Sequence, residues 1–252
     1  LFRGPETELP AGVRLATAKR GGVTVTRVEI AREGLARPRG RYVTLEMPSV
    51  SVLDERDTDV IETGAAELRA LLPPEGPVLV LGIGNRRVTA DALGPRTAQK
   101  ILVTMGPQHT LPVRGIRPVA ALAPGVSGDT GLTLRQLAAA MVDAVRPAAL
   151  ICVDSLCSAE AARLGRTIQF SDTGLHPADA RHARHLDAAA LGVPVIAAGI
   201  PTLMDADEGA DLVLTPRALD SVIAHGSALL AGILNRALQP RLSVAQLCWL
   251  TG

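Results

Sequence analysis

The stretch Val78–Pro95 reads VLVLGIGNRRVTADALGP, and it decides the fold of this chain. Its first five residues, Val78–Gly82, form an apolar run without polar alternation, which is typical of a strand buried on both faces. Two glycines and an asparagine follow and permit a tight turn with positive φ. Asp91 then stands at the start of a predicted helix, where it or Thr89 would serve as the N-cap. The order strand, turn, helix places this turn at the carboxyl end of a parallel strand, where open α/β folds hold their sites.

The same turn does not carry the signature of a nucleotide site. The glycines Gly82 and Gly84 are followed by Arg87 at the position where the G-x-G-x-x-G fingerprint has its third glycine. No GK[ST] sequence follows, so a phosphate-binding loop is not supported either. The turn therefore serves a ligand other than a nucleotide.

Downstream of this turn, short apolar segments alternate with segments of helical periodicity. Strands are expected at 119–122, 149–153, 167–170 and 194–199, and helices at 92–105, 133–145, 178–191 and 215–238. This alternation predicts an α/β fold, with a mostly parallel sheet and helices on both of its faces.

The first fifty residues follow a different pattern. The segments 13–18 and 23–30 flank Lys19-Arg20-Gly21-Gly22, which predicts a hairpin, and 41–47 alternates like a third strand. We therefore expect a small antiparallel β element at 1–50 and an α/β core at 75–240, together forming one peptidase-sized domain over 1–252.

Composition excludes several classes of partner. The net charge of the 252-residue chain is +1, so there is no bulk electrostatic attraction to nucleic acid or membrane, and aromatic residues make up only 2%. Three cysteines form no disulfide framework, which fits a reducing cytoplasm. We find no apolar span of 18 residues and expect no membrane association.

Three aspartates lie just past predicted strand ends: Asp91, Asp154 and Asp172. The carboxyl ends of parallel strands share one edge of a sheet, so Asp91 and Asp154 are expected to converge. Two carboxylates in one partly dry cleft cannot both ionise easily, so one acts as acid and the other as base toward a water molecule. The alternative is that each aspartate caps a turn or helix.

The cleft is expected to include supporting residues as well. We predict that the carboxyl groups of Asp91 and Asp154 lie within about 8 Å of each other, from the spacing of neighbouring strands. Asn85 and the turn residues Ser171, Asp172 and Thr173 are predicted to line the same cleft as substrate-binding or supporting residues, although the surroundings of Asp172 are also typical of a turn.

Other candidate chemistries find less support. His182 and His185 have i,i+3 spacing, but their charged neighbours favour a solvated helix face, and HExxH does not occur, so no metal and no cofactor are expected. Ser127 lacks the G-x-S-x-G pattern of a nucleophile elbow. Cys157 lies near Asp154, but no basic partner can be assigned to it.

Longer motifs follow one another in a fixed order: GRYVTLE at 40–46, GIGN at 82–85, VTADALGP at 88–95, RPVAALAPGV at 117–126, VDSL at 153–156, TIQFSDTG at 167–174, GVPVI at 192–196 and GIPT at 199–202. In this order, and over most of the chain, they resemble the germination proteases of spore-forming Firmicutes. The resemblance implies an atypical aspartic endopeptidase whose two essential aspartates are Asp91 and Asp154.

The resemblance also implies a biological setting. The family degrades small acid-soluble spore proteins on germination, works in the cytoplasm of the forespore and spore core, is made as a zymogen, and assembles as a homotetramer. It is related to the hydrogenase-maturation endopeptidases, which implies their phosphorylase/hydrolase-like fold. In those enzymes the equivalent acidic residues bind a metal.

The chain departs from the family pattern in the loop after Gly174, where His176-Pro177-Ala178 replaces a glycine-rich sequence, and at Leu132-Thr133, where an acidic residue is usual. Two alternatives to a spore protease therefore stay open. One is a metal-dependent maturation peptidase with Asp91 and Asp154 as ligands. The other is a non-catalytic relative that has lost its substrate loop.

Overall fold

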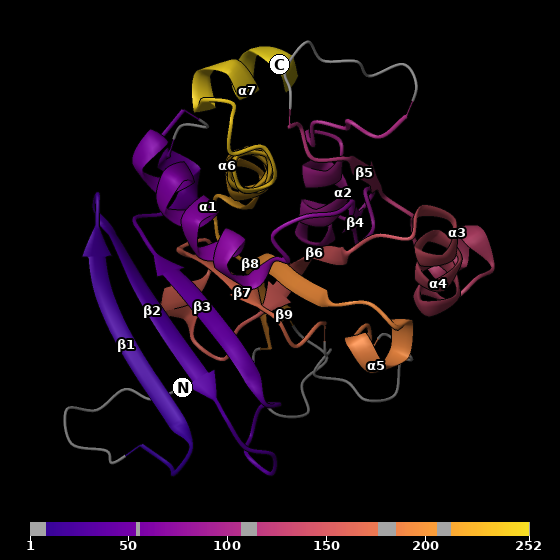
Figure 1. Cartoon of the computed structure of the whole chain (residues 1–252). Coiled ribbons are helices and arrows are strands. Elements are labelled where there is room, and N and C mark those ends of the chain that lie inside the picture. The colour runs from indigo at the N-terminus through magenta and orange to yellow at the C-terminus, as the bar shows by residue number, and fades with distance from the viewer. Residues whose placement is uncertain (1–8, 54–55, 107–114, 176–184, 206–212, 252) are drawn as a thin grey trace.

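The computed structural model describes residues 9–53, 56–106, 115–175, 185–205 and 213–251. Within them, a nine-stranded sheet has the strand order β1-β2-β3-β7-β8-β6-β4-β5, and β9 pairs with β8. The sheet runs through the whole molecule, with helices packed against it (Figure 1). The strands are β1 Val13–Arg20, β2 Val23–Ile30, β3 Gly40–Glu46, β4 Val78–Gly82, β5 Val119–Leu122, β6 Ala149–Cys157, β7 Thr167–Ser171, β8 Val195–Asp205 and β9 Val213–Leu214.

Helices cover the sheet unequally. One apolar cluster joins a face of the sheet to α1, α2 and α6, and a second joins the other face to α4 and α5. The second cluster contains two residues from each of the strands β4, β6 and β8: Leu79, Leu81, Leu150, Cys152, Val195 and Ala197. The helices are α1 Thr58–Leu71, α2 Leu93–Ala98, α3 Ser127–Thr130, α4 Leu134–Val145, α5 Ala188–Leu191, α6 Leu219–Leu238 and α7 Val244–Thr251, with short 3₁₀ turns at Val50–Val52, Thr89–Asp91 and Ala161–Arg163.

The parallel half of the sheet consists of β5, β4, β6 and β8, all running in one direction. All five residues of β4 are buried, as expected for a strand covered on both faces. The α/β class and the parallel core predicted from the sequence are confirmed.

The antiparallel half consists of β1, β2, β3 and β7. The predicted hairpin is confirmed, with Gly21 and Gly22 at positive φ in its turn. The N-terminal strands extend the main sheet, because β3 pairs with β7 and β7 pairs with β8. Both of these pairings are antiparallel, so the assumption that 167–170 runs parallel with the other core strands is wrong.

Several helix boundaries differ from those predicted. The helix expected at 92–105 ends at Ala98, because the following backbone is drawn to other elements: the Leu102 N–H donates to Asn235 Oδ1 (2.9 Å) and the Thr104 N–H to the Val119 carbonyl (2.9 Å). Of the helix expected at 178–191, the first part lies outside the described residues and α5 begins only at Ala188. The helix expected from 215 begins at Leu219, and α7 was not predicted.

The helix α6 corrects a further expectation. By length and composition, Leu219–Leu238 is apolar enough to cross a membrane, with a mean hydropathy of 1.2, so the statement that the sequence has no 18-residue apolar span is wrong. In the structure, 67% of its most apolar window is buried inside the molecule. Its contacts with α1 and α2 in the larger apolar cluster account for that composition.

Candidate active site

The loop after β4 folds back onto Asp91. The Asn85 N–H donates to Asp91 Oδ2 (2.7 Å), and the Asn85 side-chain oxygen accepts from the Arg87 N–H (2.9 Å). Gly84 has φ +124°, and a Cβ there would lie 2.0 Å from the backbone oxygen of Asp91. Glycine is therefore required at position 84. The backbone N–H of Asn85 holds the Asp91 carboxylate, so Asn85 lies next to Asp91, as the sequence predicted.

Asp154 lies within a strand rather than past its end. The strand β6 continues to Cys157, four residues beyond the predicted end, and pairs Asp154 with Gly199 of β8. On the other side of β6, pairing with β4 stops at Gly82 opposite Val153, so Asp154 is the first residue beyond the end of β4. Its Oδ1 accepts from the Ser155 N–H (2.8 Å).

One backbone hydrogen bond joins the loop that holds Asp91 to the strand that holds Asp154. The Ile83 N–H donates to the Val153 carbonyl (2.8 Å), which joins the residue before Gly84 to the residue before Asp154. Gly94 at the start of α2 fits between these strands, because a Cβ there would lie 2.2 Å from the Ile83 oxygen and 2.3 Å from the Val153 oxygen. The prediction that the two strands are parallel neighbours is confirmed. The carboxyl separation of about 8 Å stays a prediction.

Cys152 lies two residues before Asp154, on the same face of β6. It is fully buried in the smaller apolar cluster, and burial together with the Asp154 carboxylate raises the pKa of its thiol. A thiol held neutral in this way is a poor nucleophile. Cys152 therefore acts as a buried apolar side chain on the same face of β6 as the Asp154 carboxylate; we call it the apolar floor of the site. Cys157, at the end of the strand, is exposed.

Ser155, next to Asp154, was not singled out by the sequence. Its Oγ is buried and has no hydrogen-bond partner within the part of the chain that the structure describes. Buried polar atoms are generally paired with protein or water, so this hydroxyl can bind a water molecule, on the face of β6 opposite to the Asp154 side chain.

The structure places the Ser171–Thr173 turn away from the two aspartates. Because β7 is antiparallel to β8, Ser171 pairs with Ala197, toward the amino end of β8, whereas Asp154 pairs with Gly199. Asp172 therefore lies about 10 Å further along the sheet and two strands away. The expectation that this turn shares the carboxyl-end edge with the aspartates is wrong.

Asp172 has a different partner. Its Oδ2 accepts from Arg41 Nε (2.6 Å) and its Oδ1 from the Arg41 backbone N–H (2.7 Å), while Thr173 donates to Ser171 Oγ (3.3 Å). These contacts tie the start of β3 to the end of β7. A substrate-supporting role for Ser171, Asp172 and Thr173 stays a prediction.

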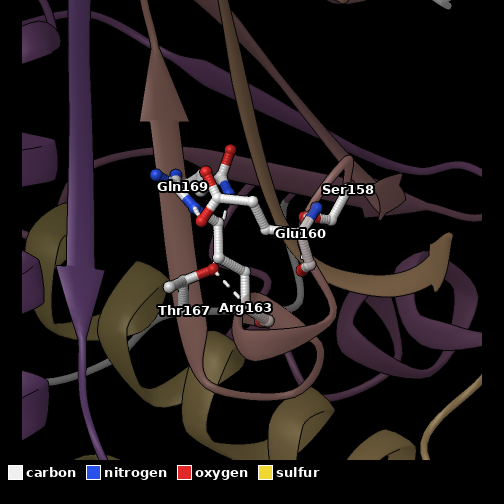
Figure 2. A network of polar contacts seen from close by, with 5 residues as sticks. All are labelled: Ser158, Glu160, Arg163, Thr167 and Gln169. Atoms are coloured by element: carbon white, nitrogen blue, oxygen red, sulfur yellow. Dashed lines mark hydrogen bonds and ion pairs between the residues drawn. The ribbon is translucent and has the colours of Figure 1, made fainter. Parts of the chain in front are cut away.

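A polar network lies beside the strand β7 (Figure 2). Arg163 Nε donates to Glu160 (3.1 Å), Thr167 Oγ1 donates to the Arg163 carbonyl (3.4 Å), and Gln169 donates to Thr167 Oγ1 (3.3 Å), while Ser158 binds the backbone of Glu160. Gln169 pairs with Gly199, the same residue that pairs with Asp154. The network therefore reaches the level of Asp154, which no spacing in the sequence indicated.

For His182 and His185, the sequence favours a solvated helix face over a metal pair, and this stays a prediction because His182 lies outside the described residues. Among the residues that are described, no three His, Cys, Asp or Glu side chains gather into a set able to hold a metal ion.

The molecule so far is an α/β protein with one acidic residue, Asp91, in the loop after β4 and another, Asp154, in the neighbouring parallel strand β6. Comparison with known proteins assigns its class. The family model described as "Germination protease" matches residues 5–209. The chain is therefore a peptidase and acts on protein substrates. It belongs to the germination protease family.

Individual relatives agree with this assignment. A germination protease of Clostridium perfringens strain 13 is 32% identical over 278 residues, covering 87% of this chain and 86% of the relative. That of Caldanaerobacter subterraneus subsp. tengcongensis is 40% identical, covering 80% of this chain and 65% of the relative, and that of Bacillus velezensis is 37% identical, covering 82% and 58%.

Among solved structures, the [NiFe] hydrogenase maturation protease HycI from Thermococcus kodakarensis aligns with a TM-score of 0.39 and 16% identity, covering 67% of this chain and 98% of that one. A TM-score below 0.5 does not establish a shared fold.

Proposed function

We propose that this protein is an aspartic endopeptidase that degrades small acid-soluble spore proteins during germination, with Asp91 and Asp154 activating a water molecule. The observation that carries the proposal is that the loop holding Asp91 and the strand holding Asp154 adjoin at the carboxyl end of β4, where Ile83 donates to the Val153 carbonyl and Asn85 donates to Asp91. Membership of the germination protease family supports a protein substrate that is cleaved during germination.

The chemistry needs one ionised and one protonated carboxyl group. The ionised group takes a proton from water as the water oxygen attacks the scissile carbonyl carbon. The protonated group then donates its proton to the leaving nitrogen as the C–N bond breaks. Two carboxyl groups that share a cleft divide these states between them because like charges in proximity disfavour double ionisation.

The surroundings of the two groups support a role in this chemistry. The Asn85 N–H donates to Asp91 and the Ser155 N–H to Asp154, so each carboxylate is oriented by a backbone donor. The apolar floor at Cys152 keeps the side of the site near Asp154 dry.

The biological setting is proposed on family membership. We place the protein in the cytoplasm of the forespore and spore core, made as a zymogen and assembled as a homotetramer. Size-exclusion chromatography with light scattering tests the tetramer.

The decisive experiment compares Asp91→Asn and Asp154→Asn with the wild type on a purified small acid-soluble spore protein. We expect each variant to fold and to lose about 10²–10⁴-fold in kcat/KM, since general acid–base catalysis supplies a factor of that size. Asp143→Asn is the matched control, because Asp143 is an exposed aspartate on α4. Retention of more than about a tenth of the activity by either site variant would contradict its assignment.

A chelator arm separates the aspartic mechanism from a metal-dependent one. We expect the wild type to keep its activity in chelator. Loss of activity that one added divalent metal restores would instead make Asp91 and Asp154 metal ligands.

A further inference from the structure

The strand register aligns one row of residues across six strands. Thr17 pairs with Thr26, Thr26 with Thr44, Thr44 with Gln169, Gln169 with Gly199, and Gly199 with Asp154. We call this set, Thr17, Thr26, Thr44, Gln169, Gly199 and Asp154, the threonine row. It runs perpendicular to the strands and ends at one of the two proposed catalytic aspartates.

The side chains of the threonine row share one face of the sheet. Their chain neighbours Val25, Val43, Phe170 and Val153 point into the larger apolar cluster under α1 and α6, so the row points the other way. Thr26, Thr44 and Gln169 are half-buried and Thr17 is exposed. In Figure 1, the strands β1, β2 and β3 lie at the edge of the molecule, away from α4 and α5.

The helical cover of this face stops beside the row. The smaller apolar cluster, formed with α4 and α5, includes Cys152 and Ala197, each two residues before its row member on the same strand. Within the described residues, that cluster contains no residue of β1, β2, β3 or β7. Among the described residues, the row therefore begins beside this cluster and continues past it, next to the polar network of Gln169, onto β3, β2 and β1.

The chemistry of the row suits a polypeptide backbone. Threonine hydroxyls and the glutamine amide both donate and accept hydrogen bonds, and the row holds no charge before Asp154. On one side, the row is flanked by Leu15, Val28 and Tyr42; on the other side, by Lys19, Thr24 and Glu46. Side chains of an extended peptide alternate between two directions, so a peptide along the row presents them to an apolar and a polar flank in turn.

The length of the row sets the length of the peptide. Strands lie about 4.8 Å apart, so Thr44, Thr26 and Thr17 are about 14, 19 and 24 Å from Asp154 along the row. An extended chain advances about 3.3 Å per residue, which corresponds to about four, six and seven residues.

We infer that an extended segment of the protein substrate, about seven residues long with alternating apolar and polar side chains, lies along the threonine row on one side of the scissile bond. The inference rests on the proposed function and adds to it the substrate-binding surface and the substrate pattern. Three features of the row support it: its continuity with Asp154, its uncharged hydrogen-bonding groups and its two unlike flanks.

The test uses peptides taken from a small acid-soluble spore protein, around the bond that a germination protease of the same family cleaves in it, shortened stepwise from either end. The variants Thr44→Tyr, Thr26→Tyr and Thr17→Tyr each place bulk in the row, and tyrosine is well accepted in strands. Ala16→Tyr is the control, because Ala16 is exposed on the same strand as Thr17 but on its opposite face.

We expect each row variant to lower kcat/KM on the longest peptide about tenfold, chiefly through KM, with Ala16→Tyr within twofold of the wild type. In the series shortened on the side of the scissile bond that lies along the row, each defect should vanish once too few residues remain on that side. The limit is about seven residues for Thr17→Tyr, about six for Thr26→Tyr and about four for Thr44→Tyr. A defect in protein stability would not follow peptide length. Equal defects at every length, or no defect on the longest peptide, would overturn the inference.

A binding measurement separates this inference from the proposed function. Fluorescence anisotropy with the Asp154→Asn variant reports the Kd of each labelled peptide without cleavage. The same order of lengths in Kd supports the row even if the wild type proves not to cleave spore proteins, and a Kd independent of length contradicts it. Failure of cleavage alone contradicts only the proposed function.

Discussion

The two halves of the sheet differ in what lies on their faces. In the parallel half, β4 is buried along its whole length between helices on both sides. In the antiparallel half, β2 alternates between buried positions such as Val25 and half-buried ones such as Thr26, because helices cover one face only. The parallel half therefore has room for polar groups only at its edge, where Asp91 and Asp154 lie, whereas the antiparallel half offers a whole face.

This difference shows that the two halves of one sheet can serve different purposes. The covered half fixes the positions of the two aspartates through tight backbone contacts, and the open half is free to vary its side chains without disturbing the core. Replacements should therefore cost most stability where two backbones meet in the parallel half and least at the surface contacts of the antiparallel half.

The largest expected effect comes from a glycine in the parallel half. Gly94→Ala forces a Cβ against the carbonyl oxygens of Ile83 and Val153, and we expect it to lower the free energy of unfolding by more than about 3 kcal/mol. Gly22→Ala is the counterpart in the β1–β2 turn, where φ is +79° and no atom lies within 4 Å of the added Cβ. It should cost about 1–2 kcal/mol, from its left-handed conformation alone. Urea denaturation measures both, and equal losses would remove the contrast between the halves.

A smaller effect should appear with alkaline pH. The raised pKa of Cys152 keeps its thiol neutral in the folded state, whereas the unfolded thiol ionises above about pH 8.5. The free energy of unfolding is therefore unaffected by this thiol below that pH. Above it, the free energy of unfolding falls by about 1.4 kcal/mol per pH unit, because only the unfolded thiol ionises. Cys152→Ala should remove this slope between pH 8.5 and 10 in urea titrations, relative to the exposed control Cys157→Ala. An unchanged slope in Cys152→Ala would show that the thiol ionises in the folded protein.

The smallest effect is expected at the ion pair between Arg41 and Asp172 in the antiparallel half. Asp172→Asn weakens a contact whose arginine is 48% exposed, so we expect a loss of about 1 kcal/mol or less in unfolding free energy. Its kcat/KM on the spore protein should stay within about threefold of the wild type, because the structure places the turn away from Asp91 and Asp154. A loss as large as that of Asp91→Asn would return Asp172 to the site.

The sequence predicted what depends on local order. The apolar run of β4, the glycine turn after it and the hairpin with Gly21 and Gly22 each follow from a few adjacent residues, and all are present. The end of α2 at Ala98 could not be read in this way, because distant partners such as Asn235 redirect the backbone that follows.

The site divides along the same line. Asp91, Asp154 and Asn85 were predicted from the apolar runs that they follow, and their role in the site stays a prediction. Ser155 and Gln169 were missed, and Asp172 was misplaced, since strand direction and register depend on pairings between residues far apart in the chain. A seven-residue segment such as 167–173 contains nothing that tells a parallel from an antiparallel strand.

The pairing of β3 with β7 also sets a timetable for biosynthesis. Val43 pairs with Phe170, which is 127 residues later in the chain (170 − 43). At a translation rate of about 5–20 residues per second, the edge of β3 waits about 6–25 s on the ribosome before its neighbour exists. During that interval the β1–β3 sheet presents an unpaired strand edge, the kind of surface that invites association between nascent chains. The position of a strand in the finished sheet thus decides how long the nascent chain must be kept from associating with other chains through that edge.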